Sequence, residues 1–210
     1  MEKDALEGVD ARFETLLEGS SSEREVQTFL KVHPFIVRNA LNAHAWNSVH
    51  LKAEFPLGGK YFADFLILSA DSGAWHAILI ELESPVARPF NQNGTPSQAL
   101  NKGLAQLDEW KIWIEKNDAS FRETLSSLVK AESVPSRCSR DHQYADAEIR
   151  DPHTVIHTSY VVVVGRRRSY SDSNAQARRG EYWDRGHEIA SYDRLLDTAK
   201  NLDPSTRRSE

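Results

Sequence analysis

Residues 58–83 read GGKYFADFLILSADSGAWHAILIELE, and the rest of the chain is best understood outward from this stretch. It holds two short apolar runs, YFADFLIL and WHAILIELE, which are rich in aromatic and branched residues and are separated by the turn-forming Asp71-Ser72-Gly73. Runs of this kind favour strands, and the short polar connection favours a hairpin. We therefore expect two adjacent strands at the centre of the fold.

Both runs carry acidic residues where a buried strand should be apolar: Asp64 in the first, and Glu81 and Glu83 in the second. An ionised carboxylate in an apolar sheet is costly unless it is paired or bound to a metal. Glu81 and Glu83 are two residues apart and would point to the same face of the strand. Three such carboxylates suit a hard divalent cation such as Mg²⁺. The structural alternative is that Glu83 lies past the strand end and Asp64 forms a salt bridge.

Composition places the chain among globular proteins with a real core: it has 210 residues, of which 40% are hydrophobic and 27% charged. Its one cysteine, Cys138, excludes an internal disulfide framework. We expect no signal peptide and no membrane span, and a cytoplasmic location. The net charge of −5 argues against a wholly basic nucleic-acid coat protein, but it is compatible with a nuclease whose metal ligands are acidic.

Apolar periodicity predicts the remaining elements. On the N-terminal side it predicts a helix at 3–18, a helix at 23–33 that begins with a Ser22–Glu25 capping box, and a half-exposed strand from Ser48. On the C-terminal side it predicts helices, strands and one flexible insertion at these positions: helices at 97–117, 121–130, 173–186 and 193–202, strands at 158–165 and 187–192, and the insertion at 131–153. This order predicts an α/β or α+β fold, a mixed sheet flanked by helices. We expect an appendage at 1–19, one domain at 20–200 and a tail at 201–210.

Seven motifs follow one another along the chain: EREVQTFLKVHP, GGKYFADFLIL, IELESP, FNQNG, SQALNKGLAQLDEW, YVVVVGRR and IASYDRLL. Each motif alone is weak, but together they span about Glu23 to Ala199. In this arrangement the chain resembles the PD-(D/E)xK nuclease superfamily. More specifically, it looks like the catalytic domain of the Shedu anti-phage defence proteins.

The resemblance implies a restriction-endonuclease-like core and a Mg²⁺ or Mn²⁺ cofactor. It implies that Asp64 and Glu81 are metal ligands, together with the main-chain carbonyl of Leu82. Gln106, on the helix that follows, would orient water or a phosphate, and Glu23 would add a ligand or support one.

One position departs from the superfamily pattern, because Glu83 stands where that pattern has lysine. The lysine normally steadies the attacking water and the developing negative charge, which a carboxylate cannot do. A second cation held by Glu83 would replace it, since two-metal sites cleave phosphodiesters without a lysine. Alternatively Lys102, one helical turn before Gln106, or less plausibly Lys60, would take its place. The remaining alternative is that the activity has been lost.

Three consecutive arginines, Arg166, Arg167 and Arg168, follow the apolar strand YVVVVG. Contacts to DNA phosphates would give them a role in binding nucleic acid. A solvated strand end with local salt bridges explains them equally well.

The leading hypothesis is a metal-dependent endonuclease that cleaves DNA in anti-phage defence. The second is a catalytically degenerate nuclease fold that binds nucleic acid or a partner protein. The third is an oligomer-forming scaffold, and a homo-oligomer also fits the resemblance.

Overall fold

The computed structural model describes residues 7–19, 22–41, 48–70, 73–131, 142–170 and 173–202. The turn residues Asp71 and Ser72, Cys138 and residues 203–210 of the predicted tail lie outside these ranges. In the described part of the chain, no helix is long and apolar enough to cross a membrane.

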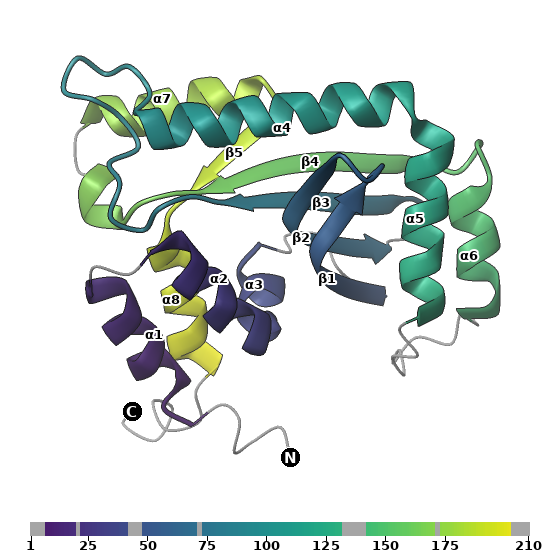
Figure 1. Cartoon of the computed structure of the whole chain (residues 1–210), viewed down its shortest axis with the longest axis horizontal. Helices are drawn as coiled ribbons and strands as arrows, with labels where there is room; N and C mark the ends of the chain where they lie inside the picture. Colours follow the sequence, from purple (N-terminus) through teal and green to yellow (C-terminus); the bar gives the residue numbers. More distant parts are fainter. Residues whose placement is uncertain are drawn as a thin grey trace. The chain divides into compact units, whose positions relative to one another are not determined.

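The strands form a five-stranded sheet in the order β1-β2-β3-β4-β5 (Figure 1). Their bounds are Ser48–Leu57, Tyr61–Ala70, Trp75–Leu82, Ile156–Val163 and His187–Ala190. The first three strands are antiparallel neighbours. Trp75 N donates to Val155 O, and Glu83 N donates to Val163 O. Residue numbers therefore increase in the same direction on both sides, so β3 and β4 are parallel. The predicted α/β class with a mixed sheet is confirmed.

The hairpin at the centre of the fold is β2–β3, whose register pairs Phe65 with Ile80 and Ala70 with Trp75. Its core positions are the branched and aromatic residues that predicted the strands. Phe65, Leu66, Ile67, Leu68, Leu79 and Ile80 are all fully buried. Burial on both faces explains why these runs are continuous rather than alternating.

The helices are α1 (Val9–Glu18), α2 (Glu23–Val32), α3 (Pro34–Leu41), α4 (Gln98–Lys116), α5 (Asp118–Ala131), α6 (His142–Arg150), α7 (Ser173–Asp184) and α8 (Tyr192–Leu202), with a short 3₁₀ turn, η1 (Arg167–Tyr170). The predicted capping box is present at α2. Ser22 Oγ accepts from Glu25 N, and Ser22 N donates to Glu25 Oε2 at 2.7 Å. These bonds satisfy main-chain donors that a helix N-terminus leaves without intrahelical partners.

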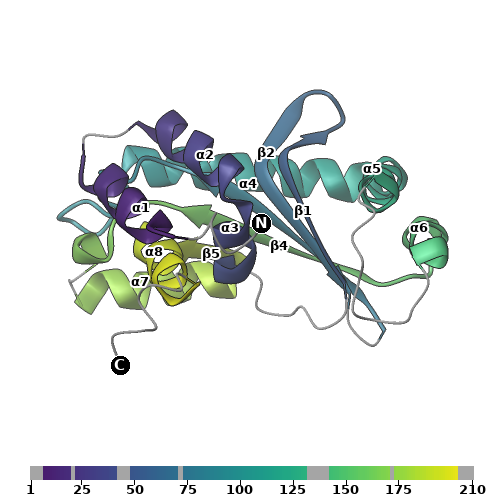
Figure 2. The ribbon, with the colours of Figure 1, turned by 90° about the horizontal axis from the view of Figure 1, so that it is seen from below.

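The prediction of a flexible insertion at 131–153 is wrong for the residues that the structure describes, because His142–Arg150 form α6. This helix lies alongside α5 (Figures 1 and 2). The buried Arg122 of α5 donates to the main-chain oxygens of Ile149, Asp151 and Thr154 at 2.9–3.1 Å. An arginine 27 residues away thus satisfies one carbonyl in the last turn of α6 and two carbonyls of the segment that follows the helix. Local periodicity contains no trace of such a contact.

The chain divides into two compact units that alternate along the sequence. Unit 1 comprises residues 1–41, 82–103 and 162–210, and unit 2 comprises residues 42–81 and 104–161. In unit 1, α1 and α3 pack against α8, and α7 packs against β5. The rings of Phe13 and Phe29 stack with 5.1 Å between their centroids.

Unit 2 is built on the hairpin, with α5 packed against β1. Its core includes an edge-to-face pair of Phe55 and Phe121, whose centroids are 6.3 Å apart, and the fully buried Trp110. Gly58 has a φ of 63°, and a Cβ there would lie 2.4 Å from the ring of Trp113. Only glycine therefore allows the turn between β1 and β2 to approach α4 so closely.

Candidate active site

Asp64 and Glu81 belong to the neighbouring strands β2 and β3 of unit 2. The ladder between β2 and β3 ends with the pair Phe65 and Ile80. Asp64 comes one residue before that pair and Glu81 one residue after it, so the same register, continued by one position, would set the two acids opposite each other. Residues that face each other across an antiparallel ladder point to the same face of the sheet. In that register the two predicted metal ligands of the hairpin would share one face.

Glu81 is the more deeply placed of the two carboxyl groups. It is only 4% exposed, whereas Asp64 is half-buried. A buried carboxylate is retained where a hydrogen bond, a cation or a metal offsets the cost of removing it from water. Gln106 belongs to the same unit and is half-buried on α4. Its role toward water or phosphate stays a prediction.

Glu54, the β1 residue that precedes Phe55, is a further acid that the sequence pattern did not indicate. The ladder pairs Ala53 with Phe65 and Phe55 with Ala63, so Glu54 falls at the position across from Asp64. Its φ is 52°, in the left-handed region that residues other than glycine rarely adopt. Such strained conformations gather at functional sites. Nothing in the local sequence SVHLKAEFPL signals this conformation.

Glu83, Lys102 and Glu23 meet in unit 1. Lys102 Nζ lies 3.0 Å from Glu83 Oε1 and 3.6 Å from Glu23 Oε2. The Glu83 side chain is only 3% exposed, whereas those of Glu23 and Lys102 are 39% and 56% exposed. The ammonium group therefore offsets a buried carboxylate on one side and a partly exposed one on the other.

The main chain fixes Glu83 firmly. Its N–H donates to Val163 O at 2.8 Å, and its carbonyl accepts from the buried Tyr192 hydroxyl at 2.7 Å. Close packing of α4 brings Lys102 within reach. At the next residue, Gly103, a Cβ would lie 2.6 Å from Val162 Cγ2 and 3.2 Å from Glu83 Cγ. The glycine thus lets the first turns of α4 approach β4 and Glu83, which lies just past the end of β3 as the sequence alternative held.

The three arginines after β4 have different surroundings. Arg166 makes a forked pair with Asp193, with N–O distances of 3.0–3.1 Å, and Arg167 N also donates to that carboxylate. The guanidinium of Arg167 bonds to Asp197. Arg168 lines a pocket described below. For Arg166 and Arg167 the structure thus supplies the local salt bridges that the sequence left as an alternative to phosphate contacts.

Asp193 is the centre of this ion-pair group. Burial by itself raises the pKa of the Asp193 carboxyl, but hydrogen bonds from the Arg166 side chain and the Arg167 main chain outweigh it. The net result is a pKa below the ordinary aspartate value. The carboxylate therefore stays ionised and anchors the start of η1 to α8.

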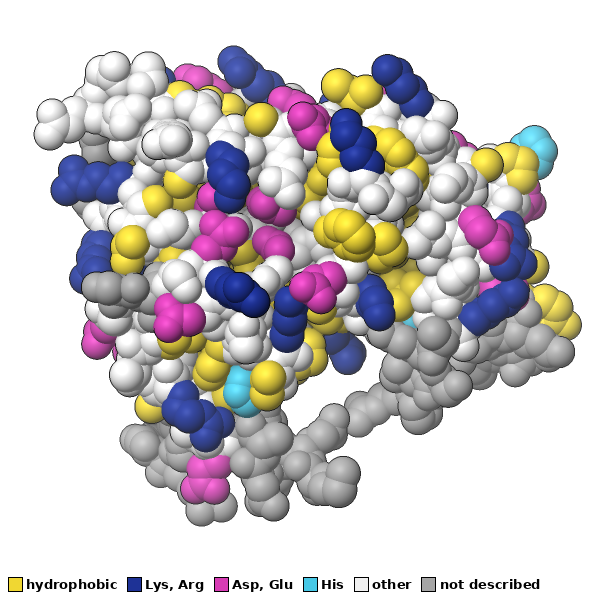
Figure 3. All heavy atoms as spheres, in the orientation of Figure 1, with side chains coloured by type: hydrophobic (Ala, Val, Ile, Leu, Met, Phe, Trp, Pro, Cys, Tyr) yellow, Lys and Arg dark blue, Asp and Glu magenta, His cyan; other side chains and the backbone are white. Residues whose placement is uncertain are grey.

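The described side chains that are visible in Figure 3 show basic and acidic groups intermixed. On this face Lys and Arg stand mostly singly among acids instead of forming one broad basic surface. Among the described residues, no group of three or more His, Cys, Asp or Glu side chains gathers closely enough to hold a metal ion. The gathering of Asp64, Glu81 and Glu83 at one metal centre stays a prediction.

Comparison with protein families gives one match that covers most of the chain. The model described as Shedu protein SduA, C-terminal, matches residues 20–196. A comparison with curated proteins gave no match. The family match includes the hairpin, α4, β4 and the start of α8, and so all the candidate residues named above. Since it spans well over half of the 210 residues, the chain belongs to the Shedu family.

Proposed function

We propose that this chain is a metal-dependent endonuclease domain that cleaves DNA phosphodiester bonds. Membership of the Shedu family indicates a role in anti-phage defence. The observation that supports the nuclease proposal is the register of the hairpin, which, continued one position past Phe65 and Ile80, would set Asp64 opposite Glu81 on one face. The pattern of an acid on each of two adjacent strands is also the basis of the resemblance to PD-(D/E)xK nucleases.

The donor groups of this pair fit Mg²⁺ or Mn²⁺. Both side chains offer carboxylate oxygens, the ligands that hard divalent cations prefer. Mg²⁺ is commonly bound by only one or two carboxylates, because it keeps several waters and takes further oxygens from substrate phosphates. Two carboxylates would therefore be enough protein ligands for a Mg²⁺ ion. A divalent cation bound there would lower the pKa of a coordinated water and offset the negative charge of the phosphate.

Lys102 is the candidate for the role of the lysine in the superfamily pattern. Glu83 occupies the expected lysine position, and Lys102 Nζ lies 3.0 Å from its carboxylate. The ammonium group of Lys102, on α4, therefore lies beside Glu83, and it would stabilise negative charge on a reacting phosphate.

The test is cleavage of supercoiled plasmid DNA in Mg²⁺, in Mn²⁺ and in EDTA. We expect cleavage only with a divalent cation, and a loss of at least about 100-fold in Asp64→Asn and Glu81→Gln. Glu148→Gln, an exposed acid on α6 in the same unit, is the matched control and should cleave at the wild-type rate.

Cleavage in EDTA, or full activity in Asp64→Asn, would overturn the proposal. Salt-dependent DNA binding without cleavage under any condition would favour the alternative, a degenerate nuclease fold that only binds.

A further inference from the structure

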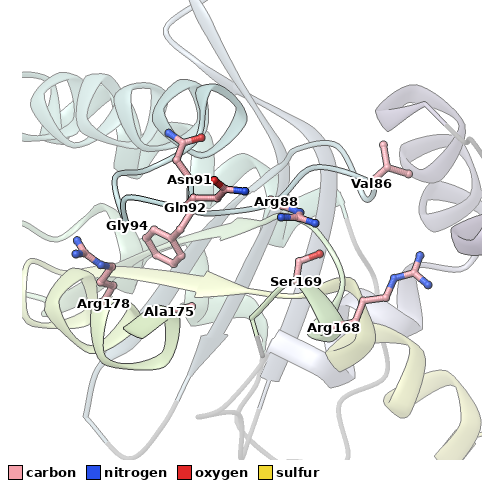
Figure 4. A pocket seen from close by; sticks show the side chains of 10 residues that line it. Val86, Arg88, Asn91, Gln92, Gly94, Arg168, Ser169, Ala175 and Arg178 are labelled. Atoms are coloured by element: carbon pink, nitrogen blue, oxygen red, sulfur yellow. The ribbon is translucent and has the colours of Figure 1, made fainter. Parts of the chain in front are cut away.

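A pocket of about 510 Å³ lies within unit 1, between the loop after β3, η1 and α7 (Figure 4). Three arginines from these three segments line it: Arg88, Arg168 and Arg178. Figure 4 shows Arg178 and Arg168 at opposite ends, with Arg88 and Ser169 between them. None of these side chains belongs to the Asp64–Glu81 pair or to the Glu83–Lys102 group.

The loop that forms one wall has a defined structure. Phe90 and Pro96 form an isolated β-bridge, and Asn91 N donates to Thr95 O at 2.8 Å. Asn91 Nδ2 donates to Thr95 Oγ1 and to Pro96 O at 3.0 and 3.1 Å. These bonds hold the loop closed, so the pocket wall exists without a ligand.

Two glycines set the shape of the pocket. Gly165 has a φ of 63°, and a Cβ there would lie 2.4 Å from Ala87 O, so the chain entering η1 passes directly against the loop. Gly94 has a φ of 79°, and a Cβ there would lie 2.5 Å from the guanidinium carbon of Arg178. The guanidinium therefore lies over the loop backbone at one end of the pocket.

Three guanidinium groups around one pocket repel one another, and a bound oxyanion would relieve this repulsion. Guanidinium matches phosphate and carboxylate with forked, charge-assisted hydrogen bonds. The Ser169 hydroxyl and the Gln92 amide add neutral donors. Because the charges are spread from one end to the other, a ligand with more than one negative charge fits better than a single small ion.

The same pocket has an apolar part, to which Val86, Phe90 and Ala175 contribute. A volume of this size lies within the range of pockets that hold small organic ligands and cofactors. We propose that the pocket binds a small phosphorylated organic molecule that carries at least two negative charges, such as a nucleoside diphosphate.

Isothermal titration of the full chain, in EDTA so that no divalent cation takes part, tests this directly with two probes. Pyrophosphate and adenosine 5′-diphosphate should each bind saturably with one site per chain. The diphosphate nucleotide should bind more tightly, because its organic part contacts the apolar wall. The readout is binding, so a failed plasmid-cleavage test leaves it unaffected.

Substitutions locate the binding. Arg88→Gln, at an exposed side chain, should weaken binding of both probes at least tenfold, and Arg88→Gln with Arg178→Gln should abolish it. Arg38→Gln, at an exposed arginine on α3 of the same unit, removes the same charge elsewhere and should leave binding unchanged. Circular dichroism checks that each variant is folded.

Three results would overturn the inference: no saturable binding of either probe, equal weakening in Arg38→Gln, or displacement of the nucleotide by an equimolar 20-nucleotide DNA strand. The last result would assign the pocket to a nucleic-acid backbone phosphate instead of a small ligand.

Discussion

Arg166, Arg167 and Arg168 show how little residue type alone says about role. Arg166 is largely buried, with 11% of its side chain exposed, and it forms a forked ion pair with Asp193, itself 16% exposed. Arg167 pairs at the surface with Asp197, where such pairs contribute little to stability. Arg168 lines the basic pocket. Three identical neighbours thus have different surroundings: the side chains of Arg166 and Arg167 pair with two different acids of α8, and Arg168 lines the pocket.

Replacing Asp193 should show how much the ion pair of Arg166 and Asp193 contributes to the free energy of unfolding. Asp193→Asn leaves the Arg166 guanidinium without its countercharge, and we expect a loss of about 2 kcal/mol in the free energy of unfolding at pH 7. Because the pKa of Asp193 is lowered in the folded protein, the ion pair contributes its full stability at pH values above the ordinary pKa of aspartate. The contribution is lost as pH falls below about 4. Urea unfolding of both proteins from pH 7 to pH 3 measures the difference.

The matched control is Asp184→Asn, an exposed aspartate at the end of α7, which should change stability little at any pH. A difference between wild type and Asp193→Asn that is constant over the whole pH range would contradict an ionic role for Asp193.

At the scale of elements, the approach of α4 to the sheet decides whether Lys102 reaches Glu83. Gly103 is the residue that permits it, since Val162 occupies the space where a side chain would begin. The sequence SQALNKGLAQLDEW predicts a helix there in spite of the glycine. It does not indicate that the glycine faces a strand.

Gly103→Ala should therefore destabilise the protein although alanine favours helix. The gain in helix propensity is up to about 1 kcal/mol. Overpacking against the fully buried Val162 costs roughly 1–3 kcal/mol, so a net loss on the order of 1 kcal/mol is expected. Thermal or urea unfolding measures it.

Gly180, inside α7, provides the comparison, because no atom lies within 4 Å of a Cβ built there. Gly180→Ala should raise the free energy of unfolding by up to about 1 kcal/mol. If both substitutions stabilised the protein equally, close packing at Gly103 would be refuted.

At the scale of the whole molecule, the decisive question is which lysine serves the proposed chemistry. Lys102→Met should lower plasmid cleavage by at least about 100-fold while leaving Mg²⁺ affinity unchanged or slightly higher, because a positive charge has been removed. Lys116→Met, an exposed lysine on the same helix, should cleave like wild type. Single-turnover cleavage and metal titration measure the two effects separately.

A charge exchange sharpens this test. Glu83→Lys combined with Lys102→Glu keeps an ion pair and moves the lysine to the strand position of the superfamily pattern. We expect activity well above that of Lys102→Met. Wild-type cleavage by Lys102→Met would show that this lysine takes no part in the reaction.

The sequence by itself determined the strands and most of the helices. Long apolar runs such as YFADFLIL and VVVV must be buried, and Ser22 with Glu25 fixes where α2 begins. It also singled out Asp64 and Glu81, because acids inside such runs carry a cost that calls for a reason. Only the tertiary structure decided that residues 142–150 form a helix, that Lys102 pairs with Glu83, that Glu54 is strained, and that Arg88, Arg168 and Arg178 share a pocket. Each of these rests on contacts between residues far apart along the chain or on backbone geometry, and local periodicity encodes neither.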